Sequence, residues 1–120
     1  MGKKTIITKE IPLPVDTVAP HLSFLQQRSP KFLYQGAWNM PDGSVLVQFK
    51  TNVSATSWGD VVDVNLYRDP TGQRCTARIK CEPLMPTQII DFGHGKRIVH
   101  EIEQDIDNFV NSFGMQQMQQ

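Results

Sequence analysis

The sequence lacks the features that define membrane-bound and exported proteins. Its 120 residues contain no run of 18 apolar residues, so we expect no membrane-spanning helix and no membrane partner. The first residues, Met1 to Ile6, include two lysines but no apolar segment after them, so no signal peptide is expected and a cytoplasmic location is the default. Gly2 does not complete a myristoylation pattern, because Ile6 stands where Ser or Thr is needed.

The chain has no excess of charge of either sign. Lysine and arginine together number 12, and so do aspartate and glutamate. A dedicated nucleic-acid binder needs a clustered basic face, and so does a binder of anionic membranes. We therefore expect no nucleic-acid partner.

Cysteine is scarce, and its placement excludes an internal disulfide. The two cysteines, Cys75 and Cys81, lie six residues apart on one predicted strand. At the rise of a β-strand they are roughly 20 Å apart, whereas a disulfide needs Cα atoms within about 7 Å. Both fall on the apolar face of the strand, so we expect two small buried side chains.

Motifs for metal binding and catalysis are also missing. The three histidines, His21, His94 and His100, show no His-x3-His spacing, and no Cys-x2-Cys pair exists, so no metal site is expected. Nothing indicates a nucleophile held beside its base. The sequence predicts no catalytic residue and no cofactor.

Alternating and helical patterns dominate what is present. Strands are predicted over 5–11, 31–39, 44–53, 58–67 and 73–81. A helix is predicted over 16–27, with Asp16 as its N-cap and Pro20 near its first turn. A second helix is predicted over 96–113. Its apolar stripe comprises Ile98, Ile102, Ile106, Phe109, Val110 and Phe113, and its solvated face Glu101, Glu103, Gln104, Asp105 and Asp107.

Turn sequences predict the strand register. A four-residue loop at 69–72 pairs Val62 with Ile79, Val64 with Ala77, Leu66 with Cys75, Asp63 with Arg78 and Asn65 with Thr76. A four-residue loop at 40–43 pairs Tyr34 with Phe49, Gly36 with Val47 and Trp38 with Val45. One face of the resulting sheet is apolar and the other mostly polar, so two helices can cover one side.

The predicted fold class is α+β, with a single antiparallel sheet of about five strands and two helices on one face. A chain of this length forms one domain, which we place at residues 1–114, followed by a Gln/Met-rich tail at 115–120. The element order is strand, helix, four strands, long helix.

This order resembles the helix-grip and TATA-binding-protein-like folds, the group that includes the Bet v 1 and START-related domains. The stretches 56–64 and 86–93 are also similar to a family of small bacterial domains. In those proteins a Lys-Asn pair usually follows, where His94-Gly95 stands here. The resemblance implies a fold more than a function, although helix-grip relatives often bind lipids, polyketides or other apolar molecules.

The resemblance suggests a non-enzymatic domain that binds a small hydrophobic ligand between the sheet and the last helix. The candidate lining residues are Tyr34, Gly36, Trp38, Phe49, Val62, Val64, Ile79 and Phe109. The predicted register puts no Asp, Glu or Lys on the inward face, which argues against an enzyme. An ordinary aromatic core is the alternative interpretation of these residues.

Two further hypotheses concern other parts of the chain. Leu46, Val61 and Tyr67 on the polar face, or an edge strand, suggest an assembly module that forms a homodimer without a small ligand. The segment His94, Gly95, Lys96 and Arg97 begins the predicted last helix, where free backbone N–H groups attract anions. The alternative for that segment is a glycine-rich hinge with two solvated cations.

Overall fold

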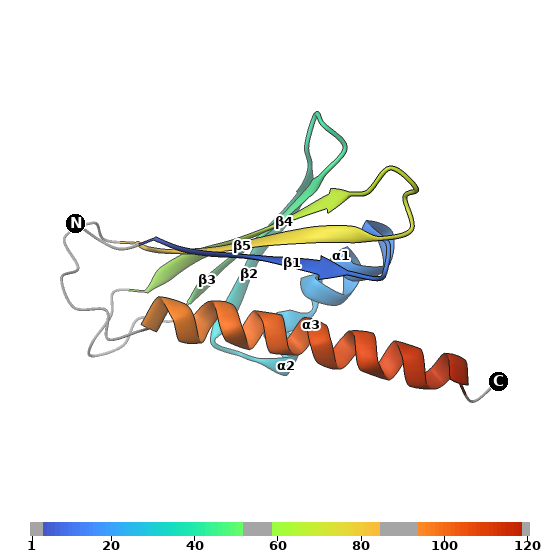
Figure 1. Ribbon diagram of the computed structural model, residues 1–120. Coiled ribbons are helices and arrows are strands. Elements are labelled where there is room, and N and C mark those ends of the chain that lie inside the picture. Colours follow the sequence, from blue (N-terminus) through green and yellow to red (C-terminus); the bar gives the residue numbers. More distant parts are fainter. Residues whose placement is uncertain (1–3, 52–58, 85–93, 119–120) are drawn as a thin grey trace.

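The computed structural model describes residues 4–51, 59–84 and 94–118, with side chains to residue 113 (Figure 1). Along the chain the elements are β1 (Thr5–Ile11), α1 (Val15–Ser23), α2 (Leu25–Arg28), β2 (Phe32–Asn39), β3 (Val45–Thr51), β4 (Asp60–Arg68), β5 (Cys75–Pro83) and α3 (His94–Met118). No helix in these ranges is long and apolar enough to cross a membrane.

The five strands form one antiparallel sheet in the order β1-β5-β4-β3-β2, so the first and last strands are neighbours. In β4 and β5 every second residue is buried from the strand start, as Val62 and Val64 show. This period of two gives the sheet an apolar inner face and a wetter outer face. The predicted α+β fold class, with one sheet and helices on one side, is confirmed.

Two helical units cover the inner face: α1 together with α2 forms one unit, and α3 forms the other. The long helix α3 lies along β1 and β5, whereas α1 packs against β2, β3 and β4, and α2 against β2 (Figure 1). The predicted stripe of α3 is confirmed: Ile98, Ile102 and Ile106 are buried, and the side chains from Phe109 to Phe113 on this stripe pack against the core. Cys75 and Cys81 are both buried in the same core, as expected.

The register predicted for β4 and β5 is wrong by two residues. Val64 faces Ile79 and Leu66 faces Ala77. The ladder ends at the pair of Arg68 and Cys75, so the connection spans 69–74 in place of 69–72. Within it the Asp69 backbone N–H donates to the Arg74 carbonyl oxygen, and the Asp69 carboxylate accepts the Arg74 N–H. A shift of two residues keeps every side chain on its predicted face.

The register predicted for β2 and β3 is confirmed at one end and wrong at the other. Tyr34 faces Phe49, but a β-bulge between Tyr34 and Gly36 moves Gly36 opposite Gln48 and Trp38 opposite Leu46. One extra residue reverses the alternation, so Gly36 and Trp38 lie on the outer face. The indole of Trp38 covers Gly36, whose absent Cβ would lie 3.0 Å from the ring.

The first helix is shorter than predicted and starts without the expected cap. It begins at Val15 after Pro14, no side chain caps it, and Asp16 lies in its first turn with its carboxylate 3.1 Å from Arg68. Pro20 lies inside the helix, where its missing N–H removes an intrahelical bond. The helix ends at Ser23, and α2 follows after the break at Phe24.

The entry into β4 requires glycine at position 59. Gly59 has a φ of +95°, and a Cβ there would lie 2.8 Å from the carbonyl oxygen of Thr51. Replacing Gly59 with Ala should therefore destabilise the protein by more than the roughly 1–2 kcal/mol of a left-handed residue alone. Gly43→Ala is the matched control, because Gly43 has a φ of +89° but open space around it. Urea denaturation measures both; equal losses of stability would contradict the contact with Thr51.

Candidate functional site

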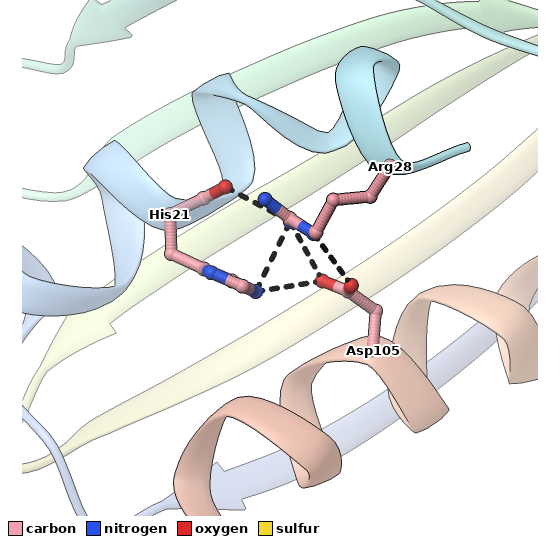
Figure 2. A network of polar contacts seen from close by, with 3 residues as sticks. All are labelled: His21, Arg28 and Asp105. Atoms are coloured by element: carbon pink, nitrogen blue, oxygen red, sulfur yellow. Dashed lines mark hydrogen bonds and ion pairs between the residues drawn. The ribbon is translucent and has the colours of Figure 1, made fainter. Parts of the chain in front are cut away.

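A polar cluster bridges the two helical units. Figure 2 shows its members: His21 from α1, Arg28 from α2 and Asp105 from α3. His21 Nε2 lies 2.8 Å from Asp105 Oδ2, and Arg28 donates from Nε to Oδ1 at 2.9 Å and from Nη2 to Oδ2 at 3.0 Å. Arg28 Nη2 also donates to the His21 carbonyl oxygen at 3.0 Å. These contacts join three helices across the seam between the two units.

The cluster is largely shielded from water, although its residues are polar and lie on helices at the surface. The side chains of His21 and Asp105 are 15% and 18% exposed, and the His21 ring stacks on Phe109 at a centroid distance of 4.0 Å. Burial alone would raise the pKa of Asp105, but the hydrogen bonds and charges of His21 and Arg28 outweigh it and hold the pKa below its usual value. Asp105 is therefore an ionised anchor between the helical units.

The prediction of a solvated acidic face on α3 is wrong for Asp105. Sequence alone contained a signal, because Asp105 lies three residues after Ile102 and four before Phe109, in phase with the apolar stripe. Other acidic residues of α3 also find cations on neighbouring elements: Lys31 pairs with Glu101, and Lys9 pairs with Asp107 and Glu103. The acidic side of α3 thus fastens the helix to its surroundings.

A second polar cluster lies where β3 ends, β4 begins and α3 starts. The Asp60 carboxylate oxygen Oδ2 accepts a hydrogen bond from Thr51 Oγ1 at 3.1 Å and lies 2.6 Å from His94 Nε2. The Asp60 backbone N–H in turn donates to Thr51 Oγ1 at 2.8 Å. Asp60 is 2% exposed, whereas the His94 side chain is 28% exposed.

This cluster corrects the expectation that no charged residue occupies the inward face. Asp60 precedes Val62 and Val64 by two and four residues, so it belongs to the same buried series. Lys9 also lies on this face, because it pairs with buried Ala77 and reaches α3 from the edge strand. The alternation of β4 in the sequence already indicated that Asp60 is buried. The sequence-based argument against an enzyme assumed that no such residue lies on the inward face, and it therefore no longer holds.

The candidate ligand residues divide between the two faces of the sheet. Phe49, Val62, Val64 and Ile79 are completely buried together in the core under the helices, and Phe109 packs at its margin. Tyr34 is on the inner face, 38% exposed, with its ring 6.1 Å from that of Phe49. Gly36 and Trp38 are on the opposite face and do not adjoin this group.

The candidate anion-binding segment forms the first turn of α3. His94 is engaged with the Asp60 carboxylate, and Gly95 is buried. Lys96 and Arg97 are exposed. The preceding stretch 86–93 lies outside the described residues. Anion binding at this turn stays a prediction.

An open hollow lies outside the core, between α2 and the edge strand β2. Its volume is about 680 Å³, and it is lined by Ser23, Phe24, Gln26, Gln27, Pro30 and Tyr34. Gln26 Oε1 accepts the backbone N–H of Tyr34 at 2.9 Å, which fastens α2 to this edge. Only Tyr34 among these residues was a sequence candidate. The break between α1 and α2 at Phe24, which lines the hollow, has no clear sequence signal.

Comparison with known proteins identifies the fold. No protein-family model matches the chain, and no curated protein matches it. A START superfamily protein from Mycobacterium smegmatis superposes with a TM-score of 0.61 at 9% identity, covering 92% of this chain and 98% of that one. The Zhui aromatase/cyclase from Streptomyces sp. R1128 gives a TM-score of 0.35 at 10% identity, covering 92% and 90%. The chain has the helix-grip fold, as its sequence resemblance implied.

The seam cluster makes a stability prediction that depends on pH. Asp105→Asn should lower the free energy of unfolding at pH 7 by about 1–2 kcal/mol, because the amide loses the charge that faces Arg28 and His21. The folded pKa of Asp105 is lowered, so its stabilisation is complete above the unfolded value near pH 4 and is lost as the pH falls through the folded pKa. Denaturation between pH 7 and pH 3 measures the difference.

The matched control for this prediction is Asp107→Asn on the same helix. Its carboxylate pairs with Lys9 but is 42% exposed, so the change should stay below about 0.5 kcal/mol. A stability difference between wild type and Asp105→Asn that stays constant down to pH 3 would contradict the role of the ionised carboxylate.

Proposed function

We propose that this domain binds a small apolar molecule between the inner face of the sheet and α3. The observation that supports the proposal is a continuous apolar inner face of the sheet, of which α3 covers only the side formed by β1 and β5. Phe49, Val62 and Val64 form the centre of this face, while α3 packs on β1 and β5 beside it. The helix-grip fold, shared with the START superfamily protein, supports the proposal, since the resemblance implies relatives that often bind apolar molecules.

The ligand has to open a packed interface. The central side chains of the inner face are fully buried, so a bound molecule must displace neighbours rather than enter free space. The seam between the helical units is held by His21, Arg28 and Asp105. Polar groups of this kind can exchange their partners for water when a seam parts, whereas apolar contacts have no such substitute.

The test is a titration of the protein with octan-1-ol, followed by the NMR signals of its methyl groups. We expect shifts for the methyl groups of Val64, Ile79 and Ile102, which line the inner face from β4, β5 and α3. The methyl groups of Val61 lie on the outer face of β4 and serve as the internal control. Unchanged inner-face signals at saturating octan-1-ol would overturn the proposal.

A pair of variants on β4 strengthens this test. Val64→Ala removes two methyl groups from the buried face and should tighten octan-1-ol binding by opening space, while lowering stability by about 1–3 kcal/mol. Val61→Ala removes the same atoms from the half-buried outer face and should leave binding unchanged. Equal effects of the two variants on affinity would place the ligand elsewhere.

Assembly into a homodimer is the second candidate function, favoured by the character of the β2 edge. This edge strand contains no charged residue, and the Trp38 side chain is 46% exposed beside Leu46. Uncharged edge strands are open to pairing with another chain. Light scattering across a concentration series should then show a dimer that Trp38→Gln abolishes and Ile6→Gln, an exposed site on the opposite edge strand β1, preserves. A monomer at high concentration would end this proposal.

A further inference from the structure

The apolar inner face ends in the cluster of Thr51, Asp60 and His94. Asp60 continues the buried series of Val62, and Thr51 continues that of Phe49 in the neighbouring strand. His94 reaches the same place from the first turn of α3. A molecule between sheet and helix would therefore meet hydrogen-bonding groups at this end and apolar side chains along the rest of its length.

We infer that His94 accepts a hydrogen bond from a hydroxyl group of the ligand, so that the domain selects apolar alcohols or phenols. This inference rests on the proposed function and adds the chemical class of the ligand. It concerns the second ring nitrogen, Nδ1, of a histidine whose Nε2 lies 2.6 Å from a buried carboxylate.

Asp60 determines which nitrogen of His94 carries the proton. An ionised carboxylate can only accept hydrogen bonds, and Asp60 Oδ2 already accepts the hydroxyl of Thr51. The 2.6 Å contact with His94 Nε2 therefore requires a proton on Nε2. In the neutral imidazole, Nδ1 then has a lone pair and no proton. Among residues 4–51, 59–84 and 94–118, no hydrogen bond to His94 Nδ1 is found.

A bare Nδ1 distinguishes between head groups. A hydroxyl can donate to it, whereas an ether or ketone oxygen would place one acceptor against another and leave both unpaired. Sites built to hydrogen-bond a polar group discriminate strongly against analogues that lack it. A carboxylate head group is disfavoured further, because it has no proton to donate and adds a negative charge near Asp60.

The burial of Asp60 is unfavourable for stability if the cluster has only a structural role. A carboxylate that is 2% exposed must be desolvated, and apolar side chains of similar volume often stabilise such a site as well or better. The adjoining Gly59 adopts a left-handed conformation against the Thr51 carbonyl. A buried charge with a polar partner is common at functional sites.

The first experiment compares two isomers at pH 8. Octan-1-ol has a hydroxyl head, and 1-methoxyheptane has the same atoms with an acceptor-only oxygen. Calorimetric titration of the wild type should give an affinity for the alcohol about three- to tenfold higher. His94→Gln should remove this preference, because the glutamine amide N–H can still donate to Asp60, while its acceptor oxygen does not lie at the position of Nδ1.

The second experiment tests the proton position without a ligand. The nitrogen-15 shifts of the His94 ring should show a protonated Nε2 and a bare Nδ1 at pH 8. In Asp60→Asn an amide replaces the carboxylate, and donation from that amide to Nε2 would move the proton to Nδ1. We expect this variant to bind 1-methoxyheptane at least as tightly as the wild type does and to lose its preference for the alcohol.

The outcomes separate the two proposals. If both isomers bind the wild type equally, or if Nε2 is found bare, the hydroxyl selection is overturned while the apolar site stands. If neither isomer binds, the proposed function fails and the inference fails with it. Alcohol preference that survives in a folded His94→Gln protein would assign the selection to another residue.

Discussion

The width of the sheet decides how this protein covers its core. Four spacings between five strands make a sheet roughly 19 Å wide, whereas an α-helix with its side chains is about 10–12 Å wide. One helix cannot cover the apolar face, so α1 with α2 covers β2 to β4 and α3 covers β1 and β5. The chain order permits this division, because α1 connects opposite edges of the sheet and α3 follows the strand next to β1.

At two places between the sheet and the helices the apolar packing gives way to polar side chains. Each place contains a histidine and a buried or half-buried aspartate. At the seam between the units, Asp105 binds His21 and Arg28. At the end of the sheet, Asp60 binds His94. Backbone and side-chain polar groups are tolerated there because they find partners, while the middle of the inner face is apolar. The same geometry makes these two places the ones at which a ligand could part the layers or meet a polar group.

Periodicity predicted the faces of the strands better than turn chemistry predicted their register. In β4 and β5 an error of two residues left Val64 and Ile79 on the correct face, because side chains alternate with a period of two. In β2 a single bulged residue reversed the placement of Gly36 and Trp38. A bulge has no reliable sequence signal, since it depends on the twist and pairing of strands that are distant in sequence.

Two charged residues lie in phase with an apolar pattern, and this position predicts that they are buried in spite of their charge. Asp60 is in step with Val62 in β4, and Asp105 is in step with Ile102 in α3. Treating acidic residues as solvated is correct for most positions, but a carboxylate in phase with buried neighbours must find a partner when the chain folds. Those partners, His94 and His21, come from 34 and 84 residues away, so no local pattern could pair them. The tertiary fold brings each carboxylate into contact with its histidine. The two buried polar clusters that result are the chemically distinctive parts of the molecule.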